Sequence, residues 1–463
     1  MASTTTTTTN TSSNNHPVVH LWLRDEVKPF EQRTPLTPLD AQFLIQQHGY
    51  KISVERSLTR AFSDAEYEQV GCELVPSHSW VLPLLHGQQE CTDTTATTNT
   101  TNNNNFYILG LKELPLPNTT VTSSNGMTIQ VPQYLTSQRH IFFAHCYKRQ
   151  SDWKETMSRF STHPSSEILD LEFLNLDNGR RVAAFGYAAG FNGMAMGLIT
   201  YCKQILSNYS LEELNQQVQP FKNRNELIQY IKNLLSQIDH IPKVLVLGAL
   251  GRCGSGSVKC AELCGIPSSH LIQWDLKETS RGGPFNELST DIDILVNDIY
   301  LSGKIEPFLT MEMVQRSDRR LSVLVDVSCD VTNPYNPFPI NSQVTTFDAP
   351  VRRVVEMACS SSSSSSCSSE FTTKPLDVIA IDHLPTMTPQ ESSEEFSNAL
   401  VRYLAELKNV NFESITPLET SLSNTDATTT TTTTTTEGVR VWLRAHELFL
   451  KKLEEYQHEK VEM

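Results

Sequence analysis

Short apolar runs recur along the chain and alternate with longer segments in which apolar residues are spaced three or four positions apart. The runs are rich in Val, Ile, Leu and Phe and contain few polar residues. This is typical of strands that are buried on both faces of a parallel sheet. The pattern predicts strands at residues 20–24, 51–55, 106–112, 141–148, 167–174, 181–186, 243–247, 270–274, 293–297, 321–327 and 378–381.

The segments between these runs carry helix signals. Thr37 can cap a helix with Pro38 in its first turn, and the helical spacing continues to Gly49, a residue that commonly ends helices. Further helices are predicted at residues 64–70, 188–206, 392–407 and 439–459. Because strands and helices alternate in both halves, we predict an α/β protein with parallel sheets.

Two local signals refine this picture. The pair Asn178-Gly179 favours a tight turn, so residues 167–174 and 181–186 are predicted to form a hairpin. The last predicted helix has an apolar stripe that includes Trp442 and Phe449. We expect it to pack back on the N-terminal domain, which would make that domain discontinuous.

The stretch from residue 243 to residue 275 combines a strand, a glycine-rich turn, a helix and a second strand that ends on Asp275. Gly248, Gly251 and Gly254 lie three residues apart in the turn, where a pyrophosphate could approach the N–H groups of the following helix. An acid about twenty residues further on suits the ribose of NAD and repels the extra phosphate of NADP. The spacing departs from G-x-G-x-x-G because position 250 is Leu, so a glycine-rich turn without a ligand is the alternative.

Composition narrows the class of protein. A chain of 463 residues can form two domains, and its net charge of −15 argues against nucleic acid and anionic membranes as partners. No apolar run reaches the roughly 18 residues that would span a bilayer. The sequence lacks a secretory signal, an Arg-rich presequence and a peroxisomal tripeptide, and its ten cysteines lack C-x-x-C pairs or zinc-ligand spacing. We therefore expect a cytoplasmic protein with reduced thiols and no metal site.

Two ionisable residues follow apolar strands of the first half. Lys112 closes the run FYILGLK, and His145 follows IFFA. Ligands of α/β proteins bind beyond the carboxyl ends of strands, where partial desolvation would lower the pKa of a lysine toward that of a general base. His145 needs little tuning for proton transfer. Position alone fits equally a solvated strand-end charge for Lys112 and a hydrogen-bonded core imidazole for His145.

Three arginines are candidates for binding carboxylates. Arg33, Arg180 and Arg181 occur in the first half, and a guanidinium matches a carboxylate in bidentate geometry. Several of them in one cleft would indicate an anionic small-molecule substrate. Taken singly, each is as readily an ordinary surface residue.

Longer sequence words carry a resemblance to a known family. RDEVKPFEQRTPLTP, GLKELP, FFAHCYK, DLEFLNLDNGRRVAAFG, GALGRCGSGS, WDLKETSRGGPF, DVTNPYNPFPI and IDHLP resemble, in this order, the NAD-dependent, lysine-forming saccharopine dehydrogenases of the fungal-type lysine pathway. The resemblance covers nearly all of residues 18–460 apart from the low-complexity tracts. It implies two Rossmann-like domains around a central cleft, as in alanine dehydrogenase and transhydrogenase, and the reversible conversion of saccharopine, NAD⁺ and water to L-lysine, 2-oxoglutarate and NADH.

The resemblance also implies residue roles. Lys112 would be the base that takes the proton of the secondary amine, and His145 would be the acid–base that serves water addition and breakdown of the carbinolamine. Glu172 would tune the lysine. The expected substrate-binding residues are Arg33, Glu113, Arg181, Phe185, Ser328, Cys329 and Asp330. The expected NAD-binding residues are Gln150, Arg180, Gly251, Arg252, Asp275, Thr279, Tyr300, Val327, Ile381, Asp382, His383 and Leu384.

The implied domains are residues 16–184 plus 386–463 for the substrate and catalysis, and residues 185–385 for NAD. We expect residues 1–15 to form a disordered tail and polar tracts at residues 92–105, 360–369 and 425–436 to be insertions. One departure concerns redox regulation. Fungal relatives carry a cysteine at the position of Asp298 that could pair with the one at Cys253, so a regulatory disulfide is not expected here.

Two other readings stay open at this point. The chain could be an alanine dehydrogenase-like enzyme, whose substrate has one carboxylate and no long second arm. It could also be an NAD-binding regulatory protein without turnover, although Lys112, His145, Arg33 and Arg181 are all present. Lys277 and Arg281 leave NADP as a second choice of cofactor. The expected partners are saccharopine, L-lysine and 2-oxoglutarate, and we expect a monomer.

Overall fold

The computed structural model describes residues 18–82, 105–135, 138–150, 152–163, 166–301, 303–329, 331–356, 358–359, 371–414 and 435–461. The chain forms two compact units. Unit 1 comprises Met1–Pro29, Thr34–Ala183 and Phe396–Met463, and unit 2 comprises Phe30–Arg33 and Ala184–Glu395. From the sequence we expected the chain to cross between domains after residues 184 and 385. The predicted tail and polar tracts lie almost entirely outside the described residues.

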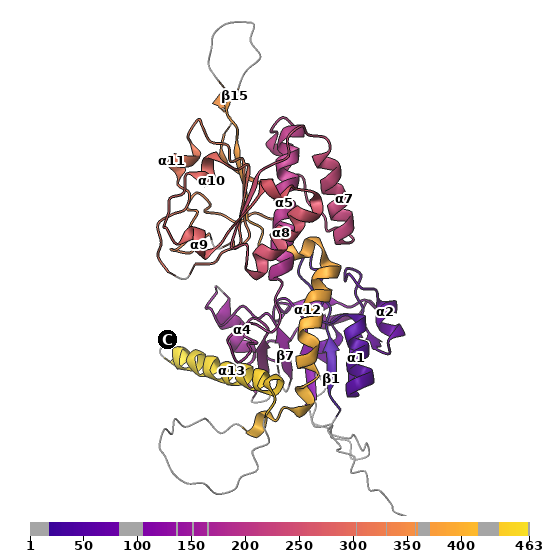
Figure 1. The fold of residues 1–463 in the computed structure, drawn as a ribbon. Helices are drawn as coiled ribbons and strands as arrows, with labels where there is room; N and C mark the ends of the chain where they lie inside the picture. The colour runs from indigo at the N-terminus through magenta and orange to yellow at the C-terminus, as the bar shows by residue number, and fades with distance from the viewer. Residues whose placement is uncertain are drawn as a thin grey trace, which may run out of the picture. The chain divides into compact units, whose positions relative to one another are not determined.

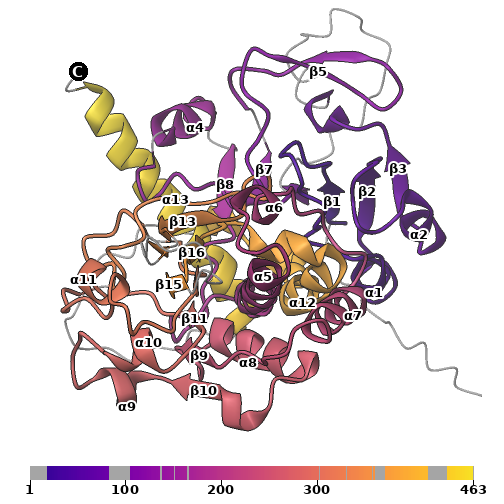
Figure 2. The same cartoon turned by 90° about the horizontal axis from the view of Figure 1, so that it is seen from above.

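Unit 1 is built on a six-stranded sheet in the order β3-β2-β1-β4-β7-β8, in which every pairing is parallel. The chain runs outward from β1 to β3 and then returns to the other side of β1, so the strand order reverses between β1 and β4 (Figure 2). The strands are β1 (His20–Leu23), β2 (Lys51–Glu55), β3 (Glu73–Val75), β4 (Phe106–Leu109), β7 (Arg139–Phe142) and β8 (Glu167–Asp170). A small hairpin of β5 (Thr120–Thr122) and β6 (Thr128–Gln130) precedes β7.

The helices of unit 1 follow local sequence signals. Helix α1 (Pro38–His48) is capped by Thr37, whose side chain accepts a hydrogen bond from the N–H of Asp40, and ends at Gly49 in the left-handed conformation, as predicted. The remaining helical segments are α2 (Asp64–Gln69), η1 (Ser79–Val81), α4 (Trp153–Arg159), η5 (Leu407–Asn409), η6 (Phe412–Ser414) and α13 (Glu437–Val461).

Helix α13, yellow in Figure 1, is the last element of the chain and belongs to unit 1. The indole of Trp442 donates a hydrogen bond to the carbonyl of Tyr403 (2.8 Å), and Nδ1 of His446 lies 2.7 Å from Glu167 at the start of β8. Phe449 is buried in the same apolar cluster as Phe142 of β7. The final helix therefore packs against the strands of the first half.

Unit 2 contains a six-stranded sheet in the order β10-β9-β11-β12-β16-β13. All pairings are parallel except that of the edge strand β13 with β16. The strands are β9 (Val244–Leu247), β10 (Leu271–Trp274), β11 (Ile294–Asn297), β12 (Val323–Asp326), β13 (Arg352–Val355) and β16 (Leu376–Ile379), with β14 (Ala358–Cys359) and β15 (Phe371–Thr373) in a separate hairpin. The α/β fold with parallel sheets predicted from the sequence is confirmed.

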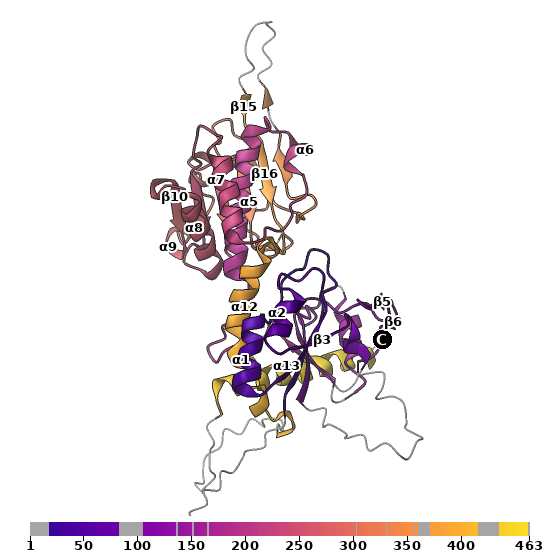
Figure 3. The same cartoon turned by 90° about the vertical axis from the view of Figure 1, so that its right-hand side faces the viewer.

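A glycine-lined helix crossing covers one face of the unit 2 sheet. Helix α5 (Gly186–Leu206) packs against α8 (Arg252–Cys264) and α7 (Arg224–Leu235), and the three are seen together in Figure 3. A Cβ atom at Gly190 would overlap the carbonyl of Cys253, and one at Gly256 would overlap the carbonyl of Tyr187. The other helical segments of this unit are α6 (Leu211–Leu214), η3 (Ser268–His270), α9 (Leu276–Thr279), α10 (Glu287–Thr290), α11 (Met311–Val314), η4 (Leu384–Met387) and the first part of α12 (Pro389–Leu404).

Several predicted boundaries were wrong at strand ends. The strand predicted at 106–112 ends at Leu109, that at 141–148 runs only from Arg139 to Phe142, and that at 167–174 ends at Asp170. The segment 181–186 is no strand but makes a single bridge between Asn175 and Arg181, and helix α5 begins at Gly186. Apolar runs continue past these strands because the turns that follow are themselves partly buried. None of the helices in the described ranges is long and apolar enough to cross a membrane.

The close approach of α5 and α8 predicts that Gly190→Ala destabilises unit 2. The new methyl group would meet backbone rather than a side chain that can move, so we expect a loss of about 1–3 kcal/mol in the free energy of unfolding. Chemical denaturation followed by circular dichroism measures it. Gly303→Ala is the matched control, because a Cβ there meets nothing within 4 Å. Equal stability of the two variants would contradict this account of the helix crossing.

Candidate active site

Three charged residues follow three neighbouring parallel strands of unit 1. Lys112 comes after β4, His145 after β7 and Glu172 after β8. Backbone pairing continues past the strands, since the N–H of Phe143 donates to the carbonyl of Leu111 at 3.0 Å. The parallel topology therefore brings the two residues predicted to transfer protons, Lys112 and His145, to the same edge of the sheet.

The pKa of Glu113 reflects the charged side chains near this edge of the sheet. Burial by itself would raise the pKa of its carboxyl, but its own backbone N–H and the positive charges of Lys28, Lys112 and His145 hold that pKa below its usual value. The ammonium of Lys28 lies 3.6 Å from Oε1 of Glu113. Lys112 and His145 are thus both close enough to the same carboxylate to act on it electrostatically.

His145 is held by its backbone, a ring and an acid. It adopts a positive φ of 53°, which is uncommon outside glycine, and its imidazole stacks on Phe143 with ring centroids 6.1 Å apart. Its Nδ1 lies 3.8 Å from Oε2 of Glu172, whose other oxygen lies 2.6 Å from the ammonium of Lys148. Glu172 therefore has His145 and Lys148 as neighbours. The expectation that it tunes Lys112 stays a prediction.

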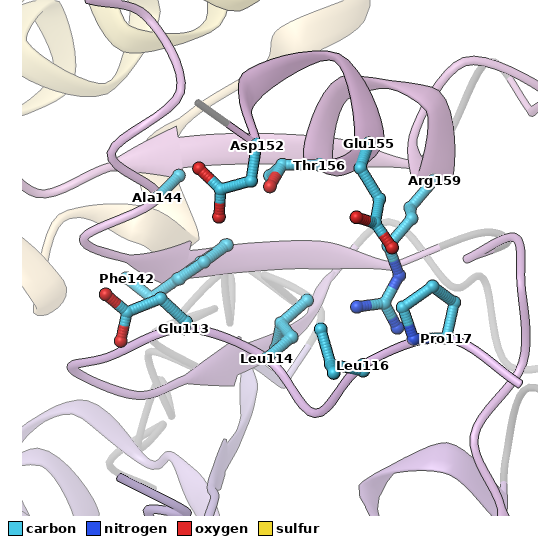
Figure 4. A pocket seen from close by; sticks show the side chains of 10 residues that line it. All are labelled: Glu113, Leu114, Leu116, Pro117, Phe142, Ala144, Asp152, Glu155, Thr156 and Arg159. Atoms are coloured by element: carbon cyan, nitrogen blue, oxygen red, sulfur yellow. The ribbon is translucent and has the colours of Figure 1, made fainter. Parts of the chain in front are cut away.

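A cavity of about 90 Å³ adjoins this edge (Figure 4). Glu113, Phe142 and Ala144 contribute to its wall, together with α4. The figure shows the carboxylates of Glu113 and Asp152 toward one end and the side chains of Glu155 and Arg159 toward the other. Carboxylates at the mouth and an apolar wall suit an aliphatic amine better than an anion.

The arginines expected to bind carboxylates lie in different settings. Arg33, in unit 2, is buried and makes a bidentate pair with Glu31, with Nε–Oε1 2.8 Å and Nη2–Oε2 2.6 Å. Its guanidinium also lies over the ring of Phe185, 4.3 Å from the ring centroid. Arg180 and Arg181 are exposed in unit 1, on the turn that Gly179 makes with φ of 80°. Only Arg33 has a carboxylate partner of its own among these contacts.

The glycine turn of unit 2 has the form that a pyrophosphate requires. Gly248 has φ of 78°, and a Cβ there would lie 2.6 Å from Ile299. Gly251 is the N-cap of α8 and supplies no side-chain cap, so the first backbone N–H groups of this 13-residue helix face outward from the turn. A Cβ at Gly254 would overlap the backbone of Gly248, which explains why the helix starts so close to the strand.

Asp275 joins the glycine turn to the end of β10. Its Oδ2 accepts a hydrogen bond from the N–H of Leu250 at 3.0 Å, and its Oδ1 accepts one from the N–H of Leu276 at 2.8 Å. Leu250 and Leu276 are both largely exposed, at 81% and 76%. The acid thus stands beside the turn between two uncovered apolar side chains, a setting that suits a ribose and the flat face of a base.

The other residues expected to bind cofactor or substrate in unit 2 also follow strands. Val327, Ser328 and Cys329 come directly after β12, and residues 381–384 follow β16, its neighbour. Ser328 donates a hydrogen bond to Asp326 at 2.6 Å. Thr279 lies on α9, Tyr300 is exposed beyond β11, Gln150 is exposed in unit 1, and Arg252 opens α8. Asp330 lies outside the described residues.

Asp298 follows β11 beside the glycine turn. Oγ of Ser257 lies 2.8 Å from the carbonyl of Gly190 and 2.7 Å from Oδ2 of Asp298. A hydroxyl has one proton and the carbonyl can only accept, so both contacts are hydrogen bonds when Asp298 is protonated. Burial raises the pKa of Asp298 to about 7, nearby Asp326 adds to the rise, and the contact with Ser257 opposes it.

Some residues at these sites were not found from the sequence. Arg24 and Glu26 contact the backbone on both sides of Lys112, Glu31 pairs with Arg33, and Lys148 pairs with Glu172. Their one signal was membership of the words RDEVKPFEQR and FFAHCYK. Within the described ranges, His, Cys, Asp and Glu side chains do not gather in threes as a metal ion would require.

The chain is similar to several known proteins. Residues 22–89 match the family "Alanine dehydrogenase/PNT, N-terminal domain". The chain is 42% identical over 400 residues to a saccharopine dehydrogenase (NAD⁺, L-lysine-forming) of Schizosaccharomyces pombe, covering 85% of this chain and 94% of that one. It is 40% identical over 437 residues to the enzyme of the same name from Emericella nidulans, covering 94% and 97%. A solved L-alanine dehydrogenase aligns over 84% of this chain and 90% of its own, with 15% identity and a TM-score of 0.48.

The protonated state of Asp298 predicts a pH-dependent stability. The unfolded chain loses this proton near pH 4 but the folded chain keeps it to about pH 7, so the residue costs the folded state progressively more as pH rises through that window. Asp298→Asn should therefore have the same Tm as the parent chain at pH 4. At pH 8 its Tm should be higher, and its free energy of unfolding should be larger by up to about 4 kcal/mol.

Scanning calorimetry at several pH values measures this difference. Asp318→Asn is the control, because Asp318 is exposed, pairs with Arg316 and has a lowered pKa, so the variant should gain nothing at pH 8. A difference between Asp298→Asn and the parent chain that is the same at pH 4 and pH 8 would refute the protonated state.

Proposed function

Because the chain belongs to the NAD-dependent, L-lysine-forming saccharopine dehydrogenase family, we propose that Lys112 and His145 carry the proton transfers of its reaction. The reaction is the reversible oxidative cleavage of saccharopine to L-lysine and 2-oxoglutarate. The observation that supports the proposal most is the parallel pairing of β4 with β7, which continues through the hydrogen bond from Phe143 to Leu111 and brings Lys112 and His145 to one edge of the sheet. Oxidation of a secondary amine and hydrolysis of the resulting imine need one base and one acid–base, and these two residues supply them.

Lys112 acts first in the direction of lysine formation. In its neutral form it takes a proton from the protonated secondary amine of saccharopine, which frees a lone pair on nitrogen that can form the C=N bond. NAD⁺, when bound, takes the hydride from the adjacent carbon. The carboxylate of Glu113 lies 3.6 Å from the ammonium of Lys28 and is influenced by Lys112, so the protonated amine of the substrate enters a site that already contains a carboxylate.

His145 acts on the imine that remains. As a base it takes a proton from water while the oxygen adds to carbon, and as an acid it gives this proton to the nitrogen of the carbinolamine. When the C–N bond breaks, His145 takes the proton of the carbinolamine hydroxyl and passes it to the released primary amine. Glu172, 3.8 Å from Nδ1, stabilises the protonated imidazole between these steps. The products are a primary amine and a ketone, and His145 returns to its starting state after the ketone forms.

Arginine side chains are proposed to bind the carboxylates of the substrate. Saccharopine carries three carboxylates, and charge-assisted hydrogen bonds to arginine contribute about 1.5–3 kcal/mol each. Arg181 is exposed on unit 1, so its guanidinium is accessible to a substrate carboxylate. Arg33 is oriented by Glu31, which occupies its Nε and one N–H of Nη2, and by the ring of Phe185, so a substrate carboxylate would meet the remaining N–H donors of a guanidinium that is already in place. Ser328, Cys329 and Asp330 stay predicted substrate-binding residues.

The residues of unit 2 fit NAD. The uncapped first turn of α8, the cradle at Gly248 and Gly251, and the acid at Asp275 would hold its pyrophosphate and ribose. Asp275 also disfavours a 2′-phosphate. Arg281, which left NADP open in the sequence, pairs with Glu287 at 2.7 Å and lies over two aromatic rings. NAD is therefore the proposed cofactor. Cytoplasmic location and a monomeric state stay predictions.

Replacing the proton-transfer residues should slow turnover without unfolding the chain. We expect Lys112→Met and His145→Gln each to lower kcat by roughly 10²–10⁴-fold. The measurement is NADH oxidation with L-lysine and 2-oxoglutarate, each omitted in turn, with ammonium and pyruvate run as the alanine dehydrogenase alternative. Turnover of the latter pair alone would replace the proposed substrate.

Matched controls lie elsewhere in unit 1. Lys51 pairs with Glu73 at the start of β2, and His458 lies on the exposed face of α13, so Lys51→Met and His458→Gln should keep the parental rate. Full activity of Lys112→Met together with His145→Gln in one chain would refute the assigned roles.

The cofactor assignment predicts a change of preference at Asp275. Asp275→Ser removes the carboxylate that repels a 2′-phosphate, so kcat/KM for NADH should fall. The ratio of kcat/KM for NADPH to kcat/KM for NADH should rise by roughly tenfold. Steady-state rates with both cofactors measure this. An unchanged ratio would place the ribose away from β10.

A further inference from the structure

The turn that carries Lys112 is held by a buried ion pair from a different strand. Arg24 and Glu26 follow β1, whose neighbour in the sheet is β4. Nη2 of Arg24 lies 3.5 Å from Oε2 of Glu26, and the two side chains are only 1% and 6% exposed. The strand order reverses between β1 and β4, the place where open α/β sheets bind their ligands.

Glu26 satisfies the donors of the turn. Its Oε1 accepts a hydrogen bond from the N–H of Leu111 at 2.6 Å, and its Oε2 accepts one from the N–H of Lys112 at 3.0 Å. Two successive backbone donors on one carboxylate fix the orientation of both peptide planes. The peptide that leads into Lys112 therefore cannot rotate without leaving a buried charge unsatisfied.

Arg24 satisfies the acceptors of the same turn. Its guanidinium donates to the carbonyl of Lys112 and, at 3.3 Å, to that of Glu113, while its backbone N–H donates to Leu109 at 3.0 Å. The guanidinium passes where a Cβ of Gly110 would stand, so only glycine fits at that position. The N–H and the carbonyl of Lys112 are thus both hydrogen-bonded, to Glu26 and Arg24 respectively.

We propose that the Arg24–Glu26 pair is a positioning device for Lys112, which sets the direction in which this side chain leaves the sheet edge. The proposal rests on the role of Lys112 in the proposed function. Neither Arg24 nor Glu26 needs to touch the substrate, because their contacts are to backbone. Proton transfer is sensitive to the placement of the base, and a shift of about 1 Å can cost on the order of 100-fold in rate.

A purely stabilising role is the competing explanation, and unit 1 offers a matched pair for it. Arg139 and Glu167 form a second buried ion pair, with Nε–Oε2 2.9 Å and side chains 10% and 4% exposed. They stand at the starts of β7 and β8, at the opposite edge of the same sheet from Lys112. Removing either pair costs stability, but only the Arg24–Glu26 pair holds the catalytic turn.

The test compares Glu26→Gln with Glu167→Gln in two backgrounds, the parent chain and Lys112→Met. In the parent chain, Glu26→Gln should lower kcat for saccharopine oxidation roughly 10- to 100-fold with the KM for NAD⁺ unchanged. Glu167→Gln should lower Tm comparably and leave kcat within about twofold. In the Lys112→Met background, Glu26→Gln should cause almost no further loss, because the residue it positions is gone.

Two outcomes would overturn the proposal. One is a parental kcat for Glu26→Gln, and the other is an equal fold-loss in both backgrounds, which is the mark of a structural role. If Glu26→Gln does not fold, Arg24→Lys keeps the charge but not the fork and should show the same background dependence. Parental activity of Lys112→Met by itself would instead refute the proposed function, so the two failures are distinguishable.

Discussion

Parallel pairing of β1, β4, β7 and β8 is the constraint on which the candidate site depends. In a parallel sheet all strands end at the same edge, so Lys112, His145 and Glu172, which follow three different strands, come to one edge of the sheet. The register of β4 against β7 continues to Leu111 and Phe143, which lie one residue before Lys112 and two residues before His145. The chemistry at this edge is therefore a consequence of how four strands align.

Charge balance is the second theme of the site. Each cation near the sheet edge has an acid close to it: Lys28 faces Glu113, and Lys148 and His145 face Glu172. Arg33, in the other unit, is paired with Glu31. Internal acids keep these basic groups ordered in an acidic protein, and an anionic substrate then meets groups that are already oriented.

Much of this could be predicted from the sequence, because the relevant signals are local. Strand and helix positions follow from apolar spacing, the cap of α1 follows from Thr37 and Pro38, and the dinucleotide turn follows from its glycines. The ends of strands could not be predicted, since Gly110 and Leu111 continue the apolar run beyond Leu109, the last residue of β4. The roles of Arg24 and Glu26 were hidden for a different reason, as they depend on the pairing of β1 with β4 across about 85 residues. Asp298 likewise acquires its proton from burial beside Ser257, which no spacing in the sequence encodes.

The most direct measurement of the central claim is a crystal structure of the chain with saccharopine and NADH bound. The account predicts that the secondary amine of saccharopine lies within hydrogen-bond distance of Nζ of Lys112, with the imidazole of His145 facing the same carbon–nitrogen bond. It would be contradicted by an amine bound away from the carboxyl ends of β4 and β7, with Lys112 and His145 both facing solvent.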